Sequence, residues 1–291
     1  MFTSHHFQAH AAAIACAILV GLAVPFSAGA ATWIENFDYP AEKNGKELKS
    51  IANPPYSNGH MYYVSGENLT YSASGYTNDP SNAGTGASGG RYPNGSTNEV
   101  TTSQAFTGST IWLSFLLNLS DAYARTGWMG LDANTPGTNG SGVNVMAQVR
   151  DNGMALAEIR VVNPQNRLYT DPDIDISSTL LMLAKIEIDG NGLDDPVSLW
   201  VDPDLSGGES GLGSPTLSKA DVDWVSDSIS SIRFSTEYTT GGSPLTDNAF
   251  IDQMRVSDDA DAFTQVTAIP EPATMSLLAF GAVVALVRRR K

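Results

Sequence analysis

The sequence predicts an all-β domain built as a two-sheet antiparallel sandwich. Short runs of β-branched and aromatic residues recur between stretches rich in Gly, Ser, Asn and Pro, which is the pattern of strands joined by turns. No segment between residues 32 and 268 repeats its apolar residues at the 3.6-residue period of a helix. Without its two unusual ends the chain keeps about 240 residues, which is enough for one large sandwich domain.

Nine runs are expected to form strands. They lie near residues 32–39, 61–64, 110–119, 143–149, 155–162, 180–188, 196–202, 229–235 and 248–257. In the third run apolar residues alternate onto one face, while Trp112 and Leu116 make the other face partly apolar, as expected of a central strand. The stretches 74–98 and 207–218 are rich in Gly, Ser, Thr and Pro, so we expect them to be surface loops.

Residues 1–30 are expected to be a signal peptide. Residues 11–24 are almost continuously small or apolar, and Ala28-Gly29-Ala30 supplies the small-residue pattern that signal peptidase accepts. We therefore expect an N-terminal signal helix and cleavage after Ala30. No Lys or Arg precedes the apolar run. A buried core helix is the alternative, although the run stands at the extreme terminus and is short for a membrane span.

The C-terminus has three parts in a fixed order. They are the tripeptide Pro270-Glu271-Pro272, an apolar stretch over 275–287, and the basic end Arg288-Arg289-Arg290-Lys291. The basic end is expected to stay cytoplasmic by the positive-inside rule. This tail resembles the PEP-CTERM class of proteins. The resemblance implies recognition by an exosortase, cleavage near the tripeptide, and delivery to the cell surface or to the extracellular matrix of a biofilm-forming bacterium.

The apolar stretch of the tail is expected to form a hydrophobic helix. Its length is marginal for a permanent span, which takes about 20 residues, and suits a segment that holds the protein in the membrane only until processing. A permanent tail anchor is the alternative. The expected organisation is a signal peptide at 1–30, a β-sandwich domain at 31–257, a linker at 258–269 and the sorting tail at 270–291.

Charge and cysteine content exclude several classes of function. The formal net charge is −15, and without the four cations of residues 288–291 it is −19. Such a charge repels phosphate groups, so nucleic acid is not expected as a partner. The only cysteine is Cys16, in the segment expected to be removed. Disulfides, thiol catalysis and cysteine metal sites are therefore not expected in the mature domain.

Two segments carry a resemblance to a known fold. Residues 184–204, AKIEIDGNGLDDPVSLWVDPD, and residues 250–256, FIDQMRV, resemble concanavalin A-like (laminin G type) jelly-roll domains. The resemblance implies a two-sheet jelly-roll sandwich, in which the first strand lies beside the last. It also implies that the domain often binds carbohydrate or a matrix component.

Oxygen-rich segments make calcium the one candidate cofactor. They are Asp171 to Asp175, Asp189 to Asp195 and Asp202 to Asp204. Calcium takes about six to eight oxygen ligands, which turns rich in Asp and Asn can supply. In the second segment Asp189 and Asp194 are the candidate ligands. The alternative is that these residues serve the backbone of turns, where Asp and Asn are also common.

Asp252 is expected in a strand, on the same face as Phe250, Met254 and Val256. A carboxylate on an apolar face needs a partner. Three arrangements remain open: a calcium ion shared with Asp38 of the first strand, a buried hydrogen-bond network, or exposure at the strand end.

Aromatic side chains in or beside loops are the candidate platforms for sugar rings, because a pyranose can lay its apolar face on an aromatic ring. They are Tyr76, Tyr92, Trp128 and Trp200. Each is alternatively a core residue. By strand alternation Trp200 faces away from its neighbours in sequence, so it points either outward or into a second layer.

No catalytic constellation is complete in the sequence. Glu187-Ile188-Asp189 resembles the start of the carboxylate strand of laminarinase-type hydrolases, but position 192 is Gly where that pattern has another Glu. His60 is the only histidine outside the signal region, which leaves too few for a histidine zinc centre. We therefore expect that the protein is not an enzyme.

The expected function is that of an exported surface or matrix protein whose non-catalytic sandwich binds glycan or another matrix component. A purely structural or adhesive protein without a dedicated ligand is one alternative, and a carbohydrate-active hydrolase or lyase is another. The expected partners are signal peptidase and exosortase during export, an extracellular polysaccharide, and the membrane through the C-terminal helix before processing.

Overall fold

The structure is a computed structural model of the chain. It describes residues 31–37, 39–51, 61–65, 69–72, 74–78, 85–88, 100–119, 124–132, 142–149, 154–162, 166–169, 174–188, 195–220, 229–238 and 249–268. The expected signal helix and C-terminal hydrophobic helix lie outside these residues. Within the described part of the chain, no helix is long and apolar enough to cross a bilayer.

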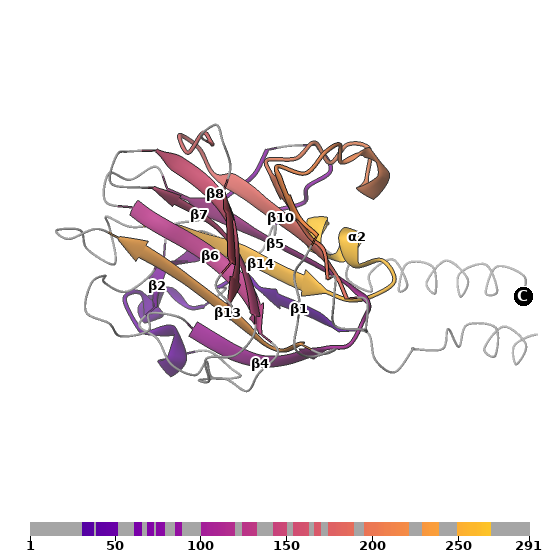
Figure 1. Ribbon diagram of the computed structural model, residues 1–291. Coiled ribbons are helices and arrows are strands. Elements are labelled where there is room, and N and C mark those ends of the chain that lie inside the picture. The colour runs from indigo at the N-terminus through magenta and orange to yellow at the C-terminus, as the bar shows by residue number, and fades with distance from the viewer. Residues whose placement is uncertain are drawn as a thin grey trace, which may run out of the picture.

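Two antiparallel sheets form the domain, as the sequence predicts (Figure 1). The eight-stranded sheet contains, in spatial order, β12 (Leu217–Lys219), β11 (Val197–Val201), β10 (Leu180–Glu187), β5 (Thr110–Asn118), β14 (Phe250–Ser257), β3 (Thr85–Ser88) and β2 (Tyr62–Ser65), with β1 (Thr32–Glu35) also paired to β14. The six-stranded sheet contains β4 (Val100–Phe106), β13 (Ile229–Tyr238), β6 (Ala124–Asp132), β7 (Gly142–Val149), β8 (Ala155–Val162) and β9 (Asn166–Tyr169).

The inner faces of the two sheets enclose the main core. Strand alternation directs Phe115 and Met182 of the eight-stranded sheet into the same cluster as Met129 and Phe234 of the six-stranded sheet, and all four are fully buried. Phe37, beyond β1, adds an edge-to-face ring contact with Phe234 at a centroid distance of 6.1 Å. Apolar burial therefore holds the layers together across the sandwich.

All nine expected strands are present, and five strands were not predicted. The additional strands are β3, β4, β6, β9 and β12. Two of these, β3 and β12, fall in stretches expected to be loops. Both are short, and their sequences carry few strand-favouring residues; pairing to β2 and β14, and to β11, defines them. Ladder pairing with neighbours has overridden the weak local preference there.

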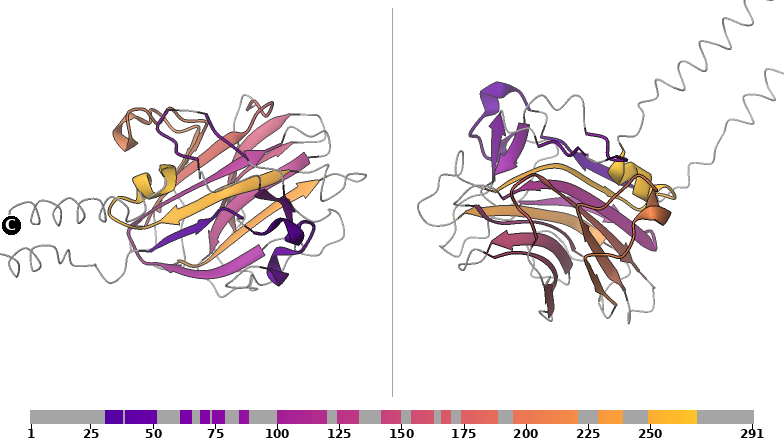
Figure 2. Two further views of the ribbon diagram at one scale, coloured as in Figure 1. Left: turned by 180° about the vertical axis from the view of Figure 1, so that it is seen from behind. Right: turned by 90° about the horizontal axis from the view of Figure 1, so that it is seen from above.

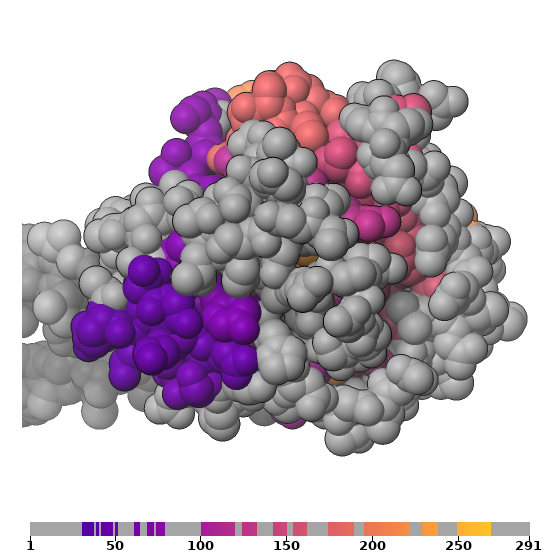
Figure 3. All heavy atoms as spheres, turned by 90° about the vertical axis from the view of Figure 1, so that its left-hand side faces the viewer, coloured from indigo at the N-terminus to yellow at the C-terminus, as the bar shows by residue number. Residues whose placement is uncertain are grey.

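The first strand lies beside the last, as the jelly-roll resemblance implies. Thr32 of β1 pairs with Ser257 of β14, and the ladder continues to Glu35 opposite Met254. The chain then forms the short 3-10 turns η1 (Ala41–Lys43) and η2 (Leu48–Ser50) beside β2. Figure 3 shows this indigo N-terminal segment as an exposed patch at one end of the molecule. The expected fold class, an all-β jelly-roll sandwich, is confirmed.

A β-bulge in β14 changes which of its side chains face the core. The register with β5 shifts between Asp252 and Arg255, and Gln253 has a positive φ of 46°. Met254 and Val256 therefore point into the main core, while Asp252 and Arg255 lie on the outer side. The expectation that Asp252 shares a face with Met254 and Val256 was wrong, because it assumed unbroken alternation.

The segment after β14 belongs to the packed domain. The helix α2 (Ala262–Thr267) lies on the outer face of the eight-stranded sheet, against β14 and β5 (Figure 2, left). Ala262 and Val266 are buried there in a second apolar cluster with Trp112 and Leu116. The segment expected to be a linker, 258–269, is thus ordered domain structure through α2, and the right-hand view in Figure 2 places α2 outside the two stacked layers.

Candidate functional site

The outer face of the eight-stranded sheet is partly covered by other segments of the chain. Its outward side chains form the second apolar cluster, which is covered by α2 and by segments around residues 69–76 and 205–212. A buried network of hydrogen bonds attaches some of these covering segments to the sheet. Arg255, 1% exposed, donates to the carbonyl oxygens of Thr77 at 2.9 Å and Val266 at 3.3 Å and to Gln253 Oε1 at 3.1 Å.

The outer face of the six-stranded sheet is polar instead. In β6, Met129 and Leu131 belong to the main core, so the alternate residues Trp128 and Asp132 face outward. The same alternation holds in β7, β8 and β13. This face carries the ionisable side chains of the sheet, and we take it as the candidate functional site.

Strand register aligns these outward residues into rows that cross the strands. The first row consists of Ser235, Trp128, Met146 and Glu158. The row on one side of it consists of Glu237, Thr126, Gln148 and Leu156. The row on its other side consists of Arg233, Gly130, Asn144 and Arg160. Among the residues of these three rows, Glu237, Gln148 and Arg160 are partly exposed, and the others are buried.

Glu158 is the most deeply placed carboxylate of this face. Its side chain is fully buried, and its Oε1 accepts a charge-assisted hydrogen bond from Arg160 Nε at 2.7 Å. Gln148 Nε2 donates to the other oxygen at 3.1 Å. A buried carboxylate needs such partners because it loses the hydration that stabilises its charge. Glu158 therefore fixes Arg160 and Gln148 above the sheet.

A second ion pair lies at the far side of the face. Arg233 Nε and Asp132 Oδ2 are 3.3 Å apart, and both side chains are almost completely buried. Two outward-facing glycines make room beside them. A Cβ on Gly142 would lie 3.4 Å from Arg233 Nη2, and a Cβ on Gly130 would lie 2.0 Å from Asn144 Oδ1. The glycines thus let long polar side chains lie flat on the sheet.

Asn144 has a buried hydrogen-bond acceptor on this face. The residue is 6% exposed, and within the described part of the chain its Oδ1 atom is buried and has no hydrogen-bond partner. Buried polar atoms are nearly always paired in folded proteins, so this atom is an exception.

Glu237 is a carboxyl of this face whose pKa is raised. Burial raises its pKa above the ordinary value, and the positive charges of Arg125 and Arg160 act in the opposite direction. Arg160 belongs to β8, three strands from β13, so its charge reaches across the face. Glu237, Arg125, Arg160 and Gln148 are all partly exposed. We call these four residues, with Glu158 beneath them, the arginine cluster.

The chemistry of the face suits a polyhydroxylated ligand. The arginine cluster offers guanidinium donors, an amide and a carboxyl group that holds its proton more tightly than usual. Arginine presents several donors in a planar fork, which matches carboxylate and sulfate groups better than a lysine ammonium does. Trp128, 8% exposed, supplies the one aromatic ring of the first row.

The aromatic residues predicted to bind sugar rings lie in different parts of the structure. Trp128 lies on the candidate face as described. Tyr76 is 8% exposed and belongs to the second apolar cluster, where Arg255 lies over its ring at 4.9 Å, so it is a buried packing residue. Trp200 points into that second layer, one of the two orientations expected, and stacks on Trp112 at 5.7 Å. Tyr92 lies outside the described residues.

The predicted calcium ligands are not brought together among the described residues. Asp38, Asp189 and Asp194 fall outside them. Asp252 is fully buried and accepts hydrogen bonds from the backbone N–H groups of Leu69 at 3.1 Å and Gln253 at 2.7 Å, which is the hydrogen-bond network considered from the sequence. In the described part of the chain, no group of three or more His, Cys, Asp or Glu side chains is placed to hold a metal ion.

Several of the other aspartates serve the backbone, which was the alternative interpretation. Asp175 and Asp204 accept the N–H groups of Ser177 and Ser206, and these bonds lower the pKa of both carboxyls. Asp202 accepts the N–H of Leu181 at 2.7 Å, but burial raises its pKa. These residues order turns near the ends of β10 and β11.

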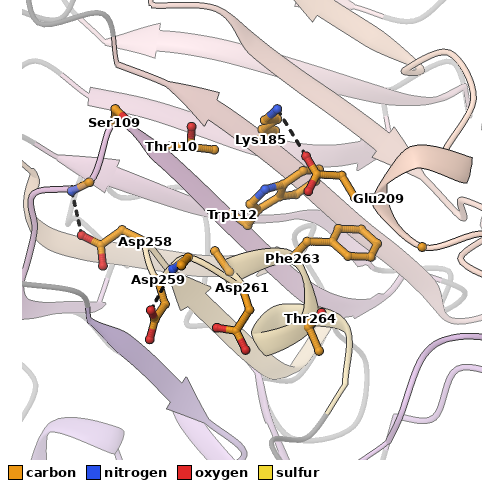
Figure 4. A pocket seen from close by; sticks show the side chains of 14 residues that line it. Ser109, Thr110, Trp112, Lys185, Glu209, Asp258, Asp259, Asp261, Phe263 and Thr264 are labelled. Carbon is orange, nitrogen blue, oxygen red and sulfur yellow. Dashed lines mark hydrogen bonds and ion pairs between the residues drawn. The ribbon is translucent and has the colours of Figure 1, made fainter. Parts of the chain in front are cut away.

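A pocket of about 670 Å³ lies on the opposite side of the molecule, next to α2. Its wall includes Trp112 and Phe263, in edge-to-face contact at 5.1 Å, and Lys185, which is paired with Glu209 at 3.4 Å (Figure 4). Its rim is acidic and includes Asp258, Asp259 and Asp261. Glu187, at the end of β10, is exposed and paired with Lys185, so the incomplete hydrolase pattern lies on this sheet and not on the candidate face.

Most residues of the candidate face were missed from the sequence. Asn144, Glu158 and Arg233 sit in or next to predicted strands, but nothing local distinguishes them from exposed polar residues. The usable signal was alternation: in 155–162 Glu158 and Arg160 occupy the positions between Ala157, Ile159 and Val161. Alternation shows which charged residues of a strand face outward. It does not show which outward residues of other strands lie beside them, because that depends on how the strands pair.

The chain is similar in fold to several solved structures. Alginate lyase Aly36B in complex with alginate tetrasaccharide is 13% identical, over 79% of this chain and 97% of that one, with a TM-score of 0.46. The Bacillus licheniformis β-glucanase is 12% identical, over 79% and 98%, with a TM-score of 0.40. The carbohydrate-binding module CBM66 from Bacillus subtilis is 11% identical, over 69% and 93%, with a TM-score of 0.34. The fold is thus that of a jelly-roll sandwich.

The C-terminus matches a known sorting motif. A family model described as the PEP-CTERM protein-sorting motif matches residues 268–291. The predicted sorting tail is confirmed, and the chain is an exported protein whose tail an exosortase recognises. A search of curated proteins finds no match.

The expectation that the protein is not an enzyme requires correction. The solved structures to which the chain is similar include a lyase and a glucanase as well as a binding module. Absence of a familiar sequence motif was therefore not a sound reason to exclude catalysis. The incomplete hydrolase pattern lies on the other sheet, while the polar face gathers residues from strands distant in sequence.

Proposed function

We propose that this exported protein binds an extracellular polysaccharide on the outer face of its six-stranded sheet. The observation that carries the proposal is the arginine cluster beside the row of Trp128, which brings together the partly exposed side chains Arg125, Gln148, Arg160 and Glu237. The proposed place of action is the cell surface or the extracellular matrix, where the sorting tail would deliver the domain.

The arrangement supports binding of an extended sugar chain. Two guanidinium groups, an amide and a carboxyl are partly exposed in the arginine cluster and could contact successive sugar units. Trp128 lies in the adjacent row and is 8% exposed, so it contributes mainly to the packing beneath the cluster.

Acidic polysaccharides fit this face better than neutral ones. Glu158 already balances Arg160. Because burial raises the pKa of Glu237, this carboxyl takes up a proton more readily than an ordinary glutamate. Protonation of Glu237 would remove one negative charge near Arg125 and Arg160 and so reduce the repulsion of a uronate or sulfate group. Affinity for an acidic chain is therefore expected to increase as the pH falls through the raised pKa of Glu237.

Binding assays on purified protein test this proposal. Neutral and uronate-containing polysaccharides are compared for binding to the wild type and to Arg125→Gln, whose arginine is partly exposed. Loss of one charge-assisted contact is expected to weaken binding of the acidic chain about tenfold. Lys219→Gln, on β12 of the other sheet, is the matched control and should bind normally. Equal binding by both variants and the wild type would contradict the proposed face.

Cleavage of the bound chain is the second candidate function. Glu237 favours it, since a partly exposed carboxyl whose pKa is raised by burial is suited to proton transfer. Polysaccharides that bind are incubated with the protein, and new reducing ends and the ultraviolet absorbance of unsaturated products are measured. Glu237→Gln should abolish product formation and retain binding. Products formed equally by this variant would assign cleavage to another group, and absence of products would leave binding alone.

A further inference from the structure

We propose that the Asp258 carboxylate is the binding site for the α-ammonium group of the mature N-terminus. This group is the one that signal peptidase creates at Ala31 if it cleaves after Ala30. The proposal depends on that cleavage position and is independent of the polysaccharide function.

Asp258 already holds the backbone of Ala31. The residue follows β14 directly and is 9% exposed. Its Oδ1 atom accepts the N–H of Ala31 at 2.5 Å, and its own N–H donates to the Ala31 carbonyl oxygen at 3.1 Å. This reciprocal pair extends the ladder between β1 and β14 by one step beyond Thr32 and Ser257. The first residue expected in the mature chain therefore lies in a defined position.

The rest of the carboxylate is held in place by a turn. Its Oδ2 atom accepts the N–H groups of Thr107 and Gly108, each at 2.8 Å. These residues connect β4 of one sheet to β5 of the other. A Cβ on Gly108 would lie 2.8 Å from the Asp258 Cβ, so glycine permits the close approach (Figure 4). Asp258 thus joins the N-terminal strand, the connection between the sheets and the last strand.

Signal-peptide removal would change the chemistry of this contact. Before cleavage the Ala31 nitrogen is a neutral peptide N–H. Hydrolysis of the bond between residues 30 and 31 consumes one water and produces a carboxylate on Ala30 and an amine on Ala31. An α-amino group has an ordinary pKa of about 7.7 to 8.0, so at neutral pH it takes up a proton. The hydrogen bond to Asp258 then becomes charge-assisted, which makes it about twice as strong.

The surrounding charges also favour a cation at this position. The pocket that Asp258 lines includes three further carboxylates, Glu209, Asp259 and Asp261, against one ammonium, that of Lys185 (Figure 4). A positively charged N-terminus would reduce the repulsion among these acidic groups. Processing is therefore expected to tighten the attachment of β1 to β14.

A double-mutant cycle tests the proposal on the chain from residue 31 to 291, kept in detergent because the apolar tail is retained. The protein is made with an N-terminal tag whose removal leaves Ala31 as the first residue. The wild type and the Asp258→Asn variant are each unfolded with urea, once with the tag and once after its removal. The substitution is expected to reduce the folding equilibrium constant about tenfold more in the untagged chain than in the tagged chain.

Asp261→Asn is the matched control, since it removes an exposed carboxylate of the same pocket. Its effect should be the same with and without the tag. An equal effect of Asp258→Asn in tagged and untagged chains would overturn the proposal and leave Asp258 a purely structural residue. So would an exported protein from the native host whose first residue is not Ala31.

A second test uses only the untagged wild type, so it can be carried out even if Asp258→Asn does not fold. The rate at which an amine reagent modifies the α-amino group is compared in the folded chain and in the same chain unfolded in urea. An ammonium bound to Asp258 should react at least about tenfold more slowly in the folded chain, because it holds its proton more tightly. Modification at the same rate in both states would overturn the proposal.

Discussion

At the scale of single residues, the candidate face depends on side chains that lie flat against the sheet. Glycine at 130 and 142 provides the space for Asn144 and Arg233, and Glu158 orients Arg160 and Gln148. None of these residues is unusual by type. Their positions relative to one another give the face its chemistry.

Gly130→Ala should disturb this face and the fold together. The new Cβ would lie 2.0 Å from Asn144 Oδ1 and 2.8 Å from the carbonyl oxygen of Val143, and the second atom belongs to the backbone. The free energy of unfolding should fall by about 1–3 kcal/mol, as is usual for overpacking. Urea unfolding measures the loss. Gly211→Ala is the control: a Cβ at Gly211 would meet nothing within 4 Å, so a loss of equal size there would remove the steric explanation.

Glu237 should make stability depend on pH. Because its pKa is raised in the folded protein, the folded state holds the proton over a pH range in which the unfolded state has released it. The free energy of unfolding should therefore fall as the pH rises from the ordinary glutamate value through the raised pKa. Glu237→Gln should remove that fall, whereas Glu42→Gln, at an exposed position, should retain it. Parallel pH profiles for wild type and Glu237→Gln would refute the assignment.

At the scale of secondary-structure elements, the bulge in β14 has the largest effect. It places Asp252, Gln253 and Arg255 on the outer side of the sheet, where their side chains bind the segments that cover it. One extra residue in a strand thus converts part of an apolar face into a set of fixed donors and acceptors. Without the bulge, α2 would keep its apolar contacts and the hydrogen bonds that Ser114 and Thr77 donate to it, and it would lose the one from Arg255.

Arg255→Met should loosen α2 and destabilise the domain. The substitution removes the donor that Arg255 supplies to the Thr77 carbonyl oxygen, and it leaves the Val266 carbonyl oxygen with the hydroxyl of Ser114 alone. The free energy of unfolding should fall by about 1–3 kcal/mol. Amide exchange of residues 262–267 should increase more than that of the core strand β5. Arg255→Lys retains the charge and a donor group, so its free energy of unfolding should lie between those of the wild type and Arg255→Met. Wild-type stability in both variants would contradict the proposal that Arg255 holds α2 on the sheet.

The elements show what local sequence could and could not provide. Runs such as 110–119 and 180–188 were placed correctly, because apolar alternation is strong in strands with one face in a core. Strand β6 was missed although it carries Trp128, since Gly127 and Gly130 interrupt its pattern. The bulge at Gln253 left no trace in the sequence either. The candidate face depends on register between β6, β7, β8 and β13, which are pairings between strands and not properties of any one of them.

At the scale of the whole molecule, the sequence was most informative at its ends. The sorting tail was recognised from the order of its three parts, and that recognition is confirmed. The sandwich class followed from strand number and spacing. The function did not follow, because enzymes and binding modules share this architecture.

The molecule recovered from its native host should lack both ends. Intact mass of surface and medium fractions should correspond to a chain that begins at Ala31 and ends near the tripeptide 270–272. A shift from the full-length mass would show both cleavages in a single measurement. Membrane-bound protein that retains residues 271–291 would instead indicate a permanent tail anchor.

The bond between Ala31 and Asp258 has a consequence for chain entropy. It places the beginning of the described domain next to the strand from which its last helix follows. A precursor held to one membrane at both ends would have the ends of its unfolded chain confined near each other, which removes conformations from the unfolded state alone. The folded domain would lose nothing, because its ends already meet. Attachment at both ends would therefore favour folding, and release from the membrane would withdraw that advantage at the moment when the α-ammonium of Ala31 becomes available.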